Sequence, residues 1–372
     1  KNVSGYKGNV KKIINLPKNE DNNYIHVYFN DNKEEIKGEK REYIVKSDNV
    51  EKIRIVIDNE VKSLKDLFQG CKIIKKISFI RFNTADIIDM SGLFSNCSAL
   101  KKLDVSNFKS GNTINIESMF ENCSALVELN LSNFNTNNIT NMNKMFYECS
   151  SIEKLNISNF ITNNVTNMYE MFCGCKCLKE LNLSSFNTDN VTSMSNIFCN
   201  CSSLKELNLS NFNINNVKKM NSMFNGCKSL KELDLSSFNT NNVTNMSGMF
   251  CKCSSLKELN LSSFNTNNVT DIRSMFYGCK SIKELNISNF NTNNVTNMCD
   301  MFNGCESLKE LNLSNFNTNN VSFMNYMFYD CKSLKELNLS SFNTNNVINM
   351  RCMFDGCSSL KELNLSNFNT NN

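Results

Sequence analysis

Apolar residues recur at fixed positions through most of the chain, and their spacing defines a unit of 26 residues. With one recurring cysteine taken as unit position 1, the unit reads C-x-S-L-K-E-L-N-L-S-N-F-N-T-N-N-V-T-N-M-x-x-M-F-x-G. No insertion breaks this register. The ladder cysteines, each 26 residues after the last, are Cys71, Cys97, Cys123, Cys149, Cys175, Cys201, Cys227, Cys253, Cys279, Cys305, Cys331 and Cys357.

Two apolar patterns occur within each unit. Leucines at unit positions 4, 7 and 9, such as Leu259 and Leu261, predict a short strand because side chains two residues apart share a face. Later in the unit, a spacing of 3, 3 and 1 predicts one face of a short helix. That second set is Val243, Met246, Met249 and Phe250. The preceding Asn-Thr-Asn-Asn run offers oxygens to cap such a helix, and Gly or Asn at the last unit position can end it.

A unit of this kind cannot bury its own apolar residues, but a stack of units buries them as continuous ladders. We therefore predict an α/β repeat fold, a leucine-rich-repeat solenoid with one short strand and one short helix per unit. Residues 61–372 form about twelve units, and a strand spacing of about 4.8 Å gives a rod of about 55 to 60 Å.

Phe108, Phe134, Phe160 and Phe186 stand where general leucine-rich repeats have Asn or Cys. The segment "MFNGCKSLKELDLSSF" instead resembles the BspA-like leucine-rich repeats of microbial surface proteins. The matching residues are Met223, Phe224, Cys227, Leu230, Leu233, Leu235, Val243 and Met246. The resemblance implies a non-enzymatic protein-interaction or adhesion scaffold displayed on a microbial surface. Its partner would be a protein, such as a host or matrix protein.

Residues 1–60 lie outside the period. The stretches "YIHVYFN", "REYIVK" and "EKIRIVID" alternate like strands, and the only proline, Pro17, lies near them. We interpret residues 1–60 as a β-rich N-terminal cap over the first repeat, since the terminal units of a solenoid are atypical. An independent binding domain is the alternative.

Charge and motifs exclude several functions. The chain has 40 basic and 36 acidic residues, not gathered into blocks, which argues against nucleic-acid binding. No apolar run approaches the roughly 18 residues of a membrane span, so we expect no direct membrane insertion by this segment. The one histidine, His26, has no catalytic constellation around it, and no cofactor motif occurs. We therefore expect no enzyme activity, no cofactor and no metal.

The ladder cysteines lie between apolar positions, so we expect buried, reduced thiols. Six cysteines stand off the ladder: Cys173, Cys177, Cys199, Cys251, Cys299 and Cys352. Cys173 and Cys199 share one unit position in adjacent units, which allows a disulfide as an alternative to free thiols. With Cys175 and Cys201 they could also be read as a four-thiolate zinc site. We disfavour zinc because the ladder cysteines should point inward.

Glutamates at unit position 6 form one column, which we expect on a concave face. A solvated polar sheet is the plain interpretation, and binding of calcium or a cationic partner is the alternative. The column is Glu180, Glu206, Glu232, Glu258, Glu284, Glu310, Glu336 and Glu362.

Residues that break the repeat without entering the core are the candidates for recognition. In "VSFMNYMFYD", the buried pattern leaves Phe323, Tyr326 and Tyr329 facing outward. Arg273 and Tyr277 lie two units earlier, and Arg351 lies in the next unit. Aromatic residues and Arg are enriched at interface hot spots, so we predict a protein-binding site there. Chance drift of an Asn-rich repeat is the alternative.

Two further interpretations stay open. Eighteen reduced cysteines also suit a cytoplasmic location and an intracellular or virion structural scaffold. The sequence stops at "LNLSNFNTNN", before the last apolar residues of that unit. We expect further repeats or a cap after it, and an open edge would favour end-to-end self-association into a self-assembling solenoid.

Overall fold

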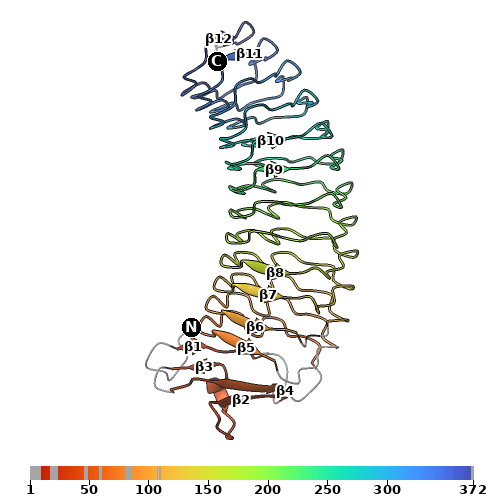
Figure 1. Cartoon of the computed structure of the whole chain (residues 1–372), viewed down its shortest axis with the longest axis vertical. Coiled ribbons are helices and arrows are strands. Elements are labelled where there is room, and N and C mark those ends of the chain that lie inside the picture. The colour runs from red at the N-terminus through yellow and green to blue at the C-terminus, as the bar shows by residue number, and fades with distance from the viewer. Residues whose placement is uncertain are drawn as a thin grey trace.

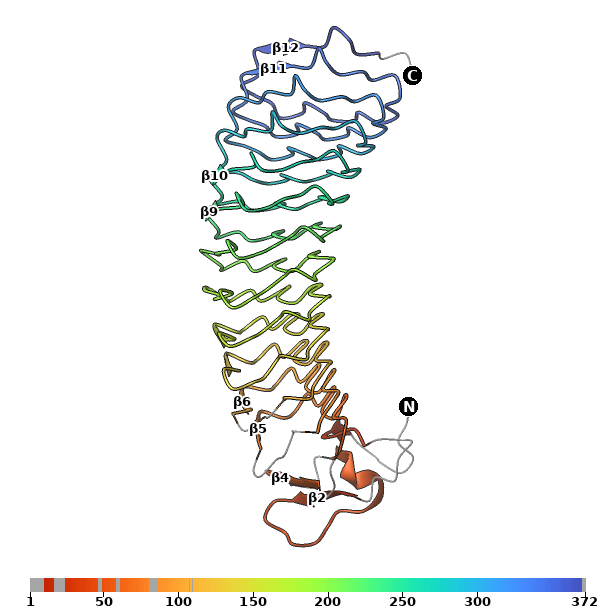
Figure 2. The same cartoon turned by 90° about the vertical axis from the view of Figure 1, so that its right-hand side faces the viewer.

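Successive 26-residue units lie one above the other in the computed structural model and together form a long, gently curved rod (Figures 1 and 2). The structure describes residues 10–16, 24–45, 49–57, 61–79, 86–106, 108 and 110–369. We call each turn of the rod a coil. Equivalent residues of neighbouring coils lie side by side, as Leu233 does with Leu259.

Two antiparallel strand pairs occupy the N-terminal end of the rod (Figure 1). Strand β1 (Lys11–Lys12) pairs with β3 (Tyr43–Ile44), and β2 (Ile25–Phe29) pairs with β4 (Ile53–Ile57). A short 3-10 helix, η2, spans Gly38–Arg41. The three stretches predicted as strands are confirmed by β2, β3 and β4, whereas Pro17 lies outside the described residues.

This N-terminal region contacts the first coil directly. The Asn15 backbone N–H donates to the Leu67 carbonyl at 2.7 Å, and the Asn15 side-chain amide donates to the Gln69 carbonyl at 3.0 Å. Ile13 and Ile14 are fully buried against the same apolar cluster as the coils. The N-terminal region and the first coil are therefore joined by apolar packing and by hydrogen bonds.

Short parallel strands follow one side of the rod (Figure 2). The predicted leucine positions are confirmed, because Leu256, Leu259 and Leu261 are all buried. The four parallel pairs are β5 (Lys76–Ser78) with β6 (Lys102–Asp104), β7 (Glu128–Asn130) with β8 (Lys154–Asn156), β9 (Glu232–Leu233) with β10 (Glu258–Leu259), and β11 (Glu336–Asn338) with β12 (Glu362–Asn364).

A second parallel ladder runs along the rod through unit position 19. It starts at Ser63 and passes from coil to coil, one residue per coil, to Asn349. Where a strand pair also occurs, neighbouring coils are joined at two separate places, which fixes their rotation as well as their spacing.

The predicted helix is wrong. The residues Val243, Met246, Met249 and Phe250 are all fully buried, as the pattern required, but they lie in a series of overlapping turns. No α-helix occurs in the residues that the structure describes. The 3, 3, 1 spacing thus predicts burial correctly but does not predict the backbone conformation.

Left-handed residues explain why no helix forms. Unit positions 22 and 26 have positive φ in every described coil, for example Gly248 (59°) and Lys252 (58°). Two left-handed residues four positions apart interrupt α-helical hydrogen bonding in each coil. The freed N–H groups donate instead to the next coil: Gly248 to the Arg273 carbonyl at 2.8 Å and Phe250 to the Met275 carbonyl at 2.9 Å.

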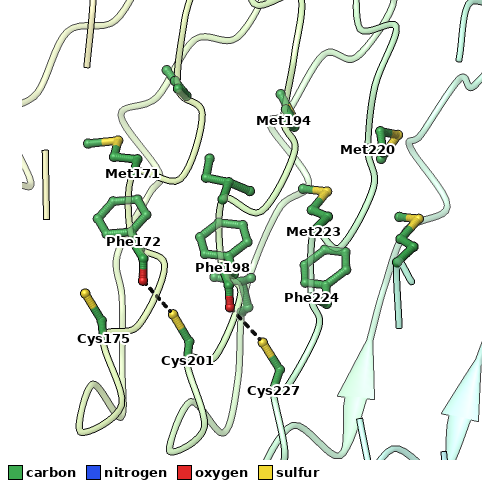
Figure 3. Packing of buried hydrophobic residues seen from close by; sticks show 14 of the residues in the cluster. Met171, Phe172, Cys175, Met194, Phe198, Cys201, Met220, Met223, Phe224 and Cys227 are labelled. Atoms are coloured by element: carbon green, nitrogen blue, oxygen red, sulfur yellow. Dashed lines mark hydrogen bonds between the residues drawn. The ribbon is translucent and has the colours of Figure 1, made fainter. Parts of the chain in front are cut away.

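The ladder cysteines and a column of phenylalanines fill the core beside these turns (Figure 3). The phenylalanine at unit position 24 stacks on its neighbours from Phe68 to Phe354, with ring centroids 5.6–5.8 Å apart. Each ladder thiol from Cys97 to Cys357 donates to the phenylalanine carbonyl of the preceding coil at 3.0–3.2 Å. Each of these ladder cysteines therefore fills apolar space in the core and also donates a hydrogen bond to the preceding coil.

Burial keeps these thiols protonated. It raises the pKa of Cys97, Cys149 and Cys305 from the ordinary value of 9.0 to about 12. The expectation of buried, free thiols is confirmed for the ladder, where only Cys357, in the last coil, is partly exposed.

The Asn-Thr-Asn-Asn run does not cap a helix but joins the coils to one another. The Thr240 hydroxyl donates to the Asn265 carbonyl at 2.8 Å and accepts from the Asn265 backbone N–H at 2.7 Å. The Asn268 side-chain amide donates to the Asn241 carbonyl at 2.7 Å. Most described coils repeat both contacts, so the polar run forms a continuous hydrogen-bonded ladder.

Candidate functional site

The turns between the second ladder and the next cysteine present one surface of the rod, which we call the turn face. It consists of the side chains at unit positions 19, 21, 22 and 25, for instance Phe323, Asn325, Tyr326 and Tyr329. Positions 20, 23 and 24 between them point into the core. In most coils the turn face is polar.

Three aromatic residues gather in one coil of this face, whereas Tyr147, Tyr169 and Tyr277 stand singly in other coils. Phe323, 39% exposed, lies in the second ladder between Asn297 and Asn349. Tyr326 and Tyr329 are half-buried, and their rings meet edge to face with centroids 5.7 Å apart. The sequence predicted that these three residues face outward, and the structure places all three at the surface, on turns and not on a helix.

The backbone holds the two tyrosines firmly. The Tyr326 N–H donates to the Arg351 carbonyl at 2.9 Å, and the Tyr329 N–H closes a turn onto the Tyr326 carbonyl at 3.2 Å. The Tyr329 carbonyl accepts from the Gly304 N–H at 2.8 Å. Both rings therefore project from a backbone tied to the coils on either side.

Two residues of the following coil extend this surface. Arg351 is exposed and lies beside Tyr326 through the backbone hydrogen bond just described. Ile348 is 73% exposed, and its N–H donates to the Ser322 carbonyl at 2.9 Å, next to Phe323. Sequence reasoning missed Ile348, although an isoleucine at a position where half of the units have Thr was a visible signal. We call Phe323, Tyr326, Tyr329, Ile348 and Arg351 the aromatic patch.

Arg273 and Tyr277 lie apart from the aromatic patch. The Arg273 Nε atom pairs with the Asp271 carboxylate of its own coil at 3.3 Å, and the Lys252 ammonium lies 5.8 Å from the Tyr277 ring centroid. A polar coil containing Asp300 and Asn303 separates them from Tyr329. The structure therefore brings only part of the predicted set together.

The glutamate column lies on the strand side, and all eight carboxylates are exposed. Neighbouring members face each other in register, as Glu232 does with Glu258, Glu284 with Glu310, and Glu336 with Glu362.

The adjoining asparagine column is already engaged. The Asn260 Oδ1 atom accepts from the Ser262 N–H at 3.0 Å, and Asn286 and Asn312 make the same contact in their coils. These oxygens are therefore occupied by backbone donors, which weakens the case for a calcium site built from Glu and Asn together.

The off-ladder cysteines do not assemble with the ladder cysteines. The thiols of Cys175 and Cys201 donate to the carbonyls of Phe146 and Phe172 at 3.2 and 3.1 Å, inside the core. No group of three or more His, Cys, Asp or Glu side chains able to hold a metal occurs in the described part of the chain. In the N-terminal region, the His26 Nδ1 atom lies 2.9 Å from the Glu35 carboxylate.

Together, the parallel ladders, the buried leucines and the turn face define a solenoid of the leucine-rich-repeat type, with ladders of Phe and Asn. The chain belongs to the family described as "Mycoplasma protein of unknown function, DUF285". Overlapping matches to that family cover residues 62–181, 114–233, 175–285 and 279–372. A comparison with curated proteins gave no match.

Solved structures with some likeness include two bacterial leucine-rich-repeat proteins. One, a leucine-rich repeat protein from Bacteroides ovatus, is 18% identical over 84% of this chain and 78% of its own, with a TM-score of 0.45. The other, a leucine rich cell surface protein from Faecalibacterium prausnitzii, is 14% identical over 87% of this chain and 92% of its own, with a TM-score of 0.33. Among the described residues, no helix is long and apolar enough to cross a membrane.

Proposed function

We propose that this chain is a non-enzymatic interaction scaffold displayed on a microbial surface, and that the aromatic patch binds a protein partner such as a host or matrix protein. The observation that carries the proposal is the gathering of Phe323, Tyr326 and Tyr329 in one coil of a mostly polar turn face. The resemblance of the repeat to BspA-like surface proteins supports the surface location.

The conformation of Tyr326 strengthens this argument. Its φ of 58° is left-handed, a region in which a bulky side chain is strained by about 1 to 3 kcal/mol. Other coils place Gly, Ser, Asn or another residue without an aromatic ring at this position. Folding alone gives no reason for a tyrosine there, whereas a rigid, half-buried ring beside an exposed Arg is typical of an interface hot spot.

The test is the triple variant Phe323→Asn, Tyr326→Ser and Tyr329→Asn, which restores residues found at the same positions in other coils. Binding to immobilised matrix proteins and to intact host cells is measured for wild type and variant. Each hot-spot side chain contributes about 2 kcal/mol, so a single Tyr326→Ser change should already weaken affinity about 30-fold.

A matched control is the strand-side variant Glu258→Gln, Glu284→Gln and Glu310→Gln, which changes three exposed residues outside the aromatic patch. It should bind like wild type, and both variants should keep the wild-type melting temperature. Wild-type affinity in the aromatic variant, or loss of binding only in the glutamine variant, would move the site to the strand side.

The free thiols favour a second candidate, an intracellular structural scaffold. All eighteen cysteines are unpaired, which suits a reducing compartment. Antibody labelling of intact cells separates the two: labelling without permeabilisation supports the surface scaffold, and labelling only after permeabilisation supports the intracellular one.

A further inference from the structure

Two cysteines occupy the same turn-face position in consecutive coils. Cys173 and Cys199 stand at unit position 25, where the other coils carry Gln, Ser, Glu, Tyr, Asn or Asp and, in one coil, Cys251. Cys173 is 7% exposed, and Cys199 is half-buried. The pair is thus shielded on one side and accessible at Cys199.

The backbone holds these residues in register. The Gly174 N–H donates to the Cys199 carbonyl at 2.7 Å, and the rings of Phe172 and Phe198 stack just before them at 5.8 Å. Neighbouring strands lie about 4.8 Å apart, and disulfides span Cα separations of about 4.4 to 6.8 Å. No large backbone movement is needed to join the two sulfurs.

The two thiols act on each other's ionisation: a side-chain hydrogen bond between them raises the pKa of Cys173 and lowers the pKa of Cys199. The ladder thiols instead donate to carbonyls in the core. Cys251 has the same unit position and is 8% exposed, but Asn225 and Tyr277 occupy the equivalent positions of its neighbouring coils. Cys173 and Cys199 are therefore the only two cysteines at this unit position that lie in adjacent coils.

We propose that Cys173 and Cys199 form an oxidisable dithiol that reacts with hydroperoxides and closes to a disulfide, linking two coils covalently on the turn face. This inference is independent of the aromatic patch.

The chemistry balances in two steps. The Cys199 thiolate attacks one peroxide oxygen, the O–O bond breaks, and the other oxygen leaves with a proton as water or an alcohol, giving a sulfenic acid on Cys199. The Cys173 sulfur then attacks the Cys199 sulfur, its thiol proton joins the departing hydroxyl, and water leaves as the S–S bond forms. Two thiols and one hydroperoxide give one disulfide, one alcohol or water, and one further water.

The roles follow from exposure and electrostatics. Cys199 is the more exposed of the two, and the hydrogen bond from Cys173 lowers the Cys199 pKa despite burial and the nearby Glu170 carboxylate. The same hydrogen bond raises the pKa of Cys173. Cys199 is therefore the attacking thiol and Cys173 the resolving one.

The experiment treats the full chain with hydrogen peroxide and measures intact mass and cysteine-containing peptides. We expect a mass lower by two hydrogens, reversed by dithiothreitol. Fragmentation must assign the bond to Cys173 and Cys199 and exclude Cys175 and Cys201, which share their tryptic peptides. The Cys173→Ser variant should stop at a sulfenic acid on Cys199 that dimedone traps.

Cys251→Ser is the matched control and should form the same disulfide, whereas Cys199→Ser should form none. Burial raises the Cys251 pKa to about 11, so in the wild type Cys199 should oxidise at least about tenfold faster than Cys251. A folded protein, verified by circular dichroism, that forms no Cys173–Cys199 disulfide overturns the proposal. Equal oxidation rates at Cys199 and Cys251 overturn it as well.

Discussion

Alkaline pH should unfold the solenoid through its ladder cysteines. Their pKa values are raised by burial, so the folded state holds thiol protons that the unfolded chain releases. The stabilising effect is fully present below the unfolded pKa of about 9 and is lost as pH rises toward the folded pKa values. The sensitive window is therefore about pH 9 to about pH 12 for Cys97, Cys149 and Cys305, whose folded pKa is about 12.

The magnitude follows from the size of the shift. One pKa unit corresponds to about 1.4 kcal/mol, so at about pH 10.5 each such thiol loses about 2 kcal/mol of its contribution. Three thiols lose about 6 kcal/mol together, which is comparable with the total stability of a typical domain. The other ladder thiols shift in the same direction, among them Cys227 and Cys331. Loss of structure should therefore precede ionisation of the ladder in the native state.

The assay follows circular dichroism and thiolate absorbance through one pH titration. Both signals should change together above about pH 9, because the ladder ionises only as coils open. Lysines and tyrosines also titrate near pH 10, so the specific control is a double variant, Cys227→Val with Cys253→Val. Removing two titrating groups should flatten the dependence of unfolding free energy on pH by about 1.4 kcal/mol per pH unit for each thiol. Full thiolate absorbance with an unchanged dichroism spectrum, or an unchanged slope in the double variant, would refute the reasoning.

Two further predictions concern the ladders. Phe224→Ala removes a fully buried ring stacked on both sides and should cost about 3 to 5 kcal/mol in urea denaturation, and a loss below about 1 kcal/mol would contradict the packing. Thr240→Val keeps the shape but leaves the Asn265 N–H and carbonyl without their hydroxyl partner, which should cost about 2 to 3 kcal/mol. The exposed Thr244→Val, whose hydroxyl donates to the Lys218 carbonyl at 3.1 Å, is its control and should change stability by less than about 0.5 kcal/mol. Equal losses of unfolding free energy in the two variants would show that the buried threonine hydroxyl stabilises the fold no more than the exposed one does.

The period and the core positions could be predicted from sequence because burial alone decides them. Met246, Met249 and Phe250 are buried in any arrangement that stacks the units. Backbone conformation could not be predicted in the same way, since the overlapping turns and a helix both bring residues three or four apart onto one face. The contrary signal was Gly248 in the middle of the expected helix, at a position where the same chain also places Ser and Asn. Those residue types tolerate the left-handed conformation that the turns require.

Contacts between coils were the other feature hidden from sequence reasoning. The threonine hydroxyl bonds a residue 25 positions away, and the asparagine at unit position 16 bonds one 27 positions away. A local pattern suggests a local cap for such residues, and only the stacked coils show their partners. For the same reason, the pairing of Arg273 with Asp271 and the exposure of Ile348 beside Phe323 became apparent only in three dimensions.

Some unit positions hold side chains that form hydrogen bonds with a neighbouring coil, and others do not. This difference explains at which positions the repeat can vary to recognise a particular partner. Unit positions 1, 14 and 16 each hold a side chain that forms a hydrogen bond with a neighbouring coil, so changing one breaks a contact between coils. On the turn face, backbone groups form the hydrogen bonds between coils, and most side chains take no part in joining one coil to the next. Position 25 accordingly varies along the chain from Glu121 through Tyr147 and Cys173 to Asn225 and Asp355, while its carbonyl keeps accepting from the preceding coil. A surface whose chemistry can change without altering the rod is the one on which recognition can develop, and both the aromatic patch and the thiol pair lie there.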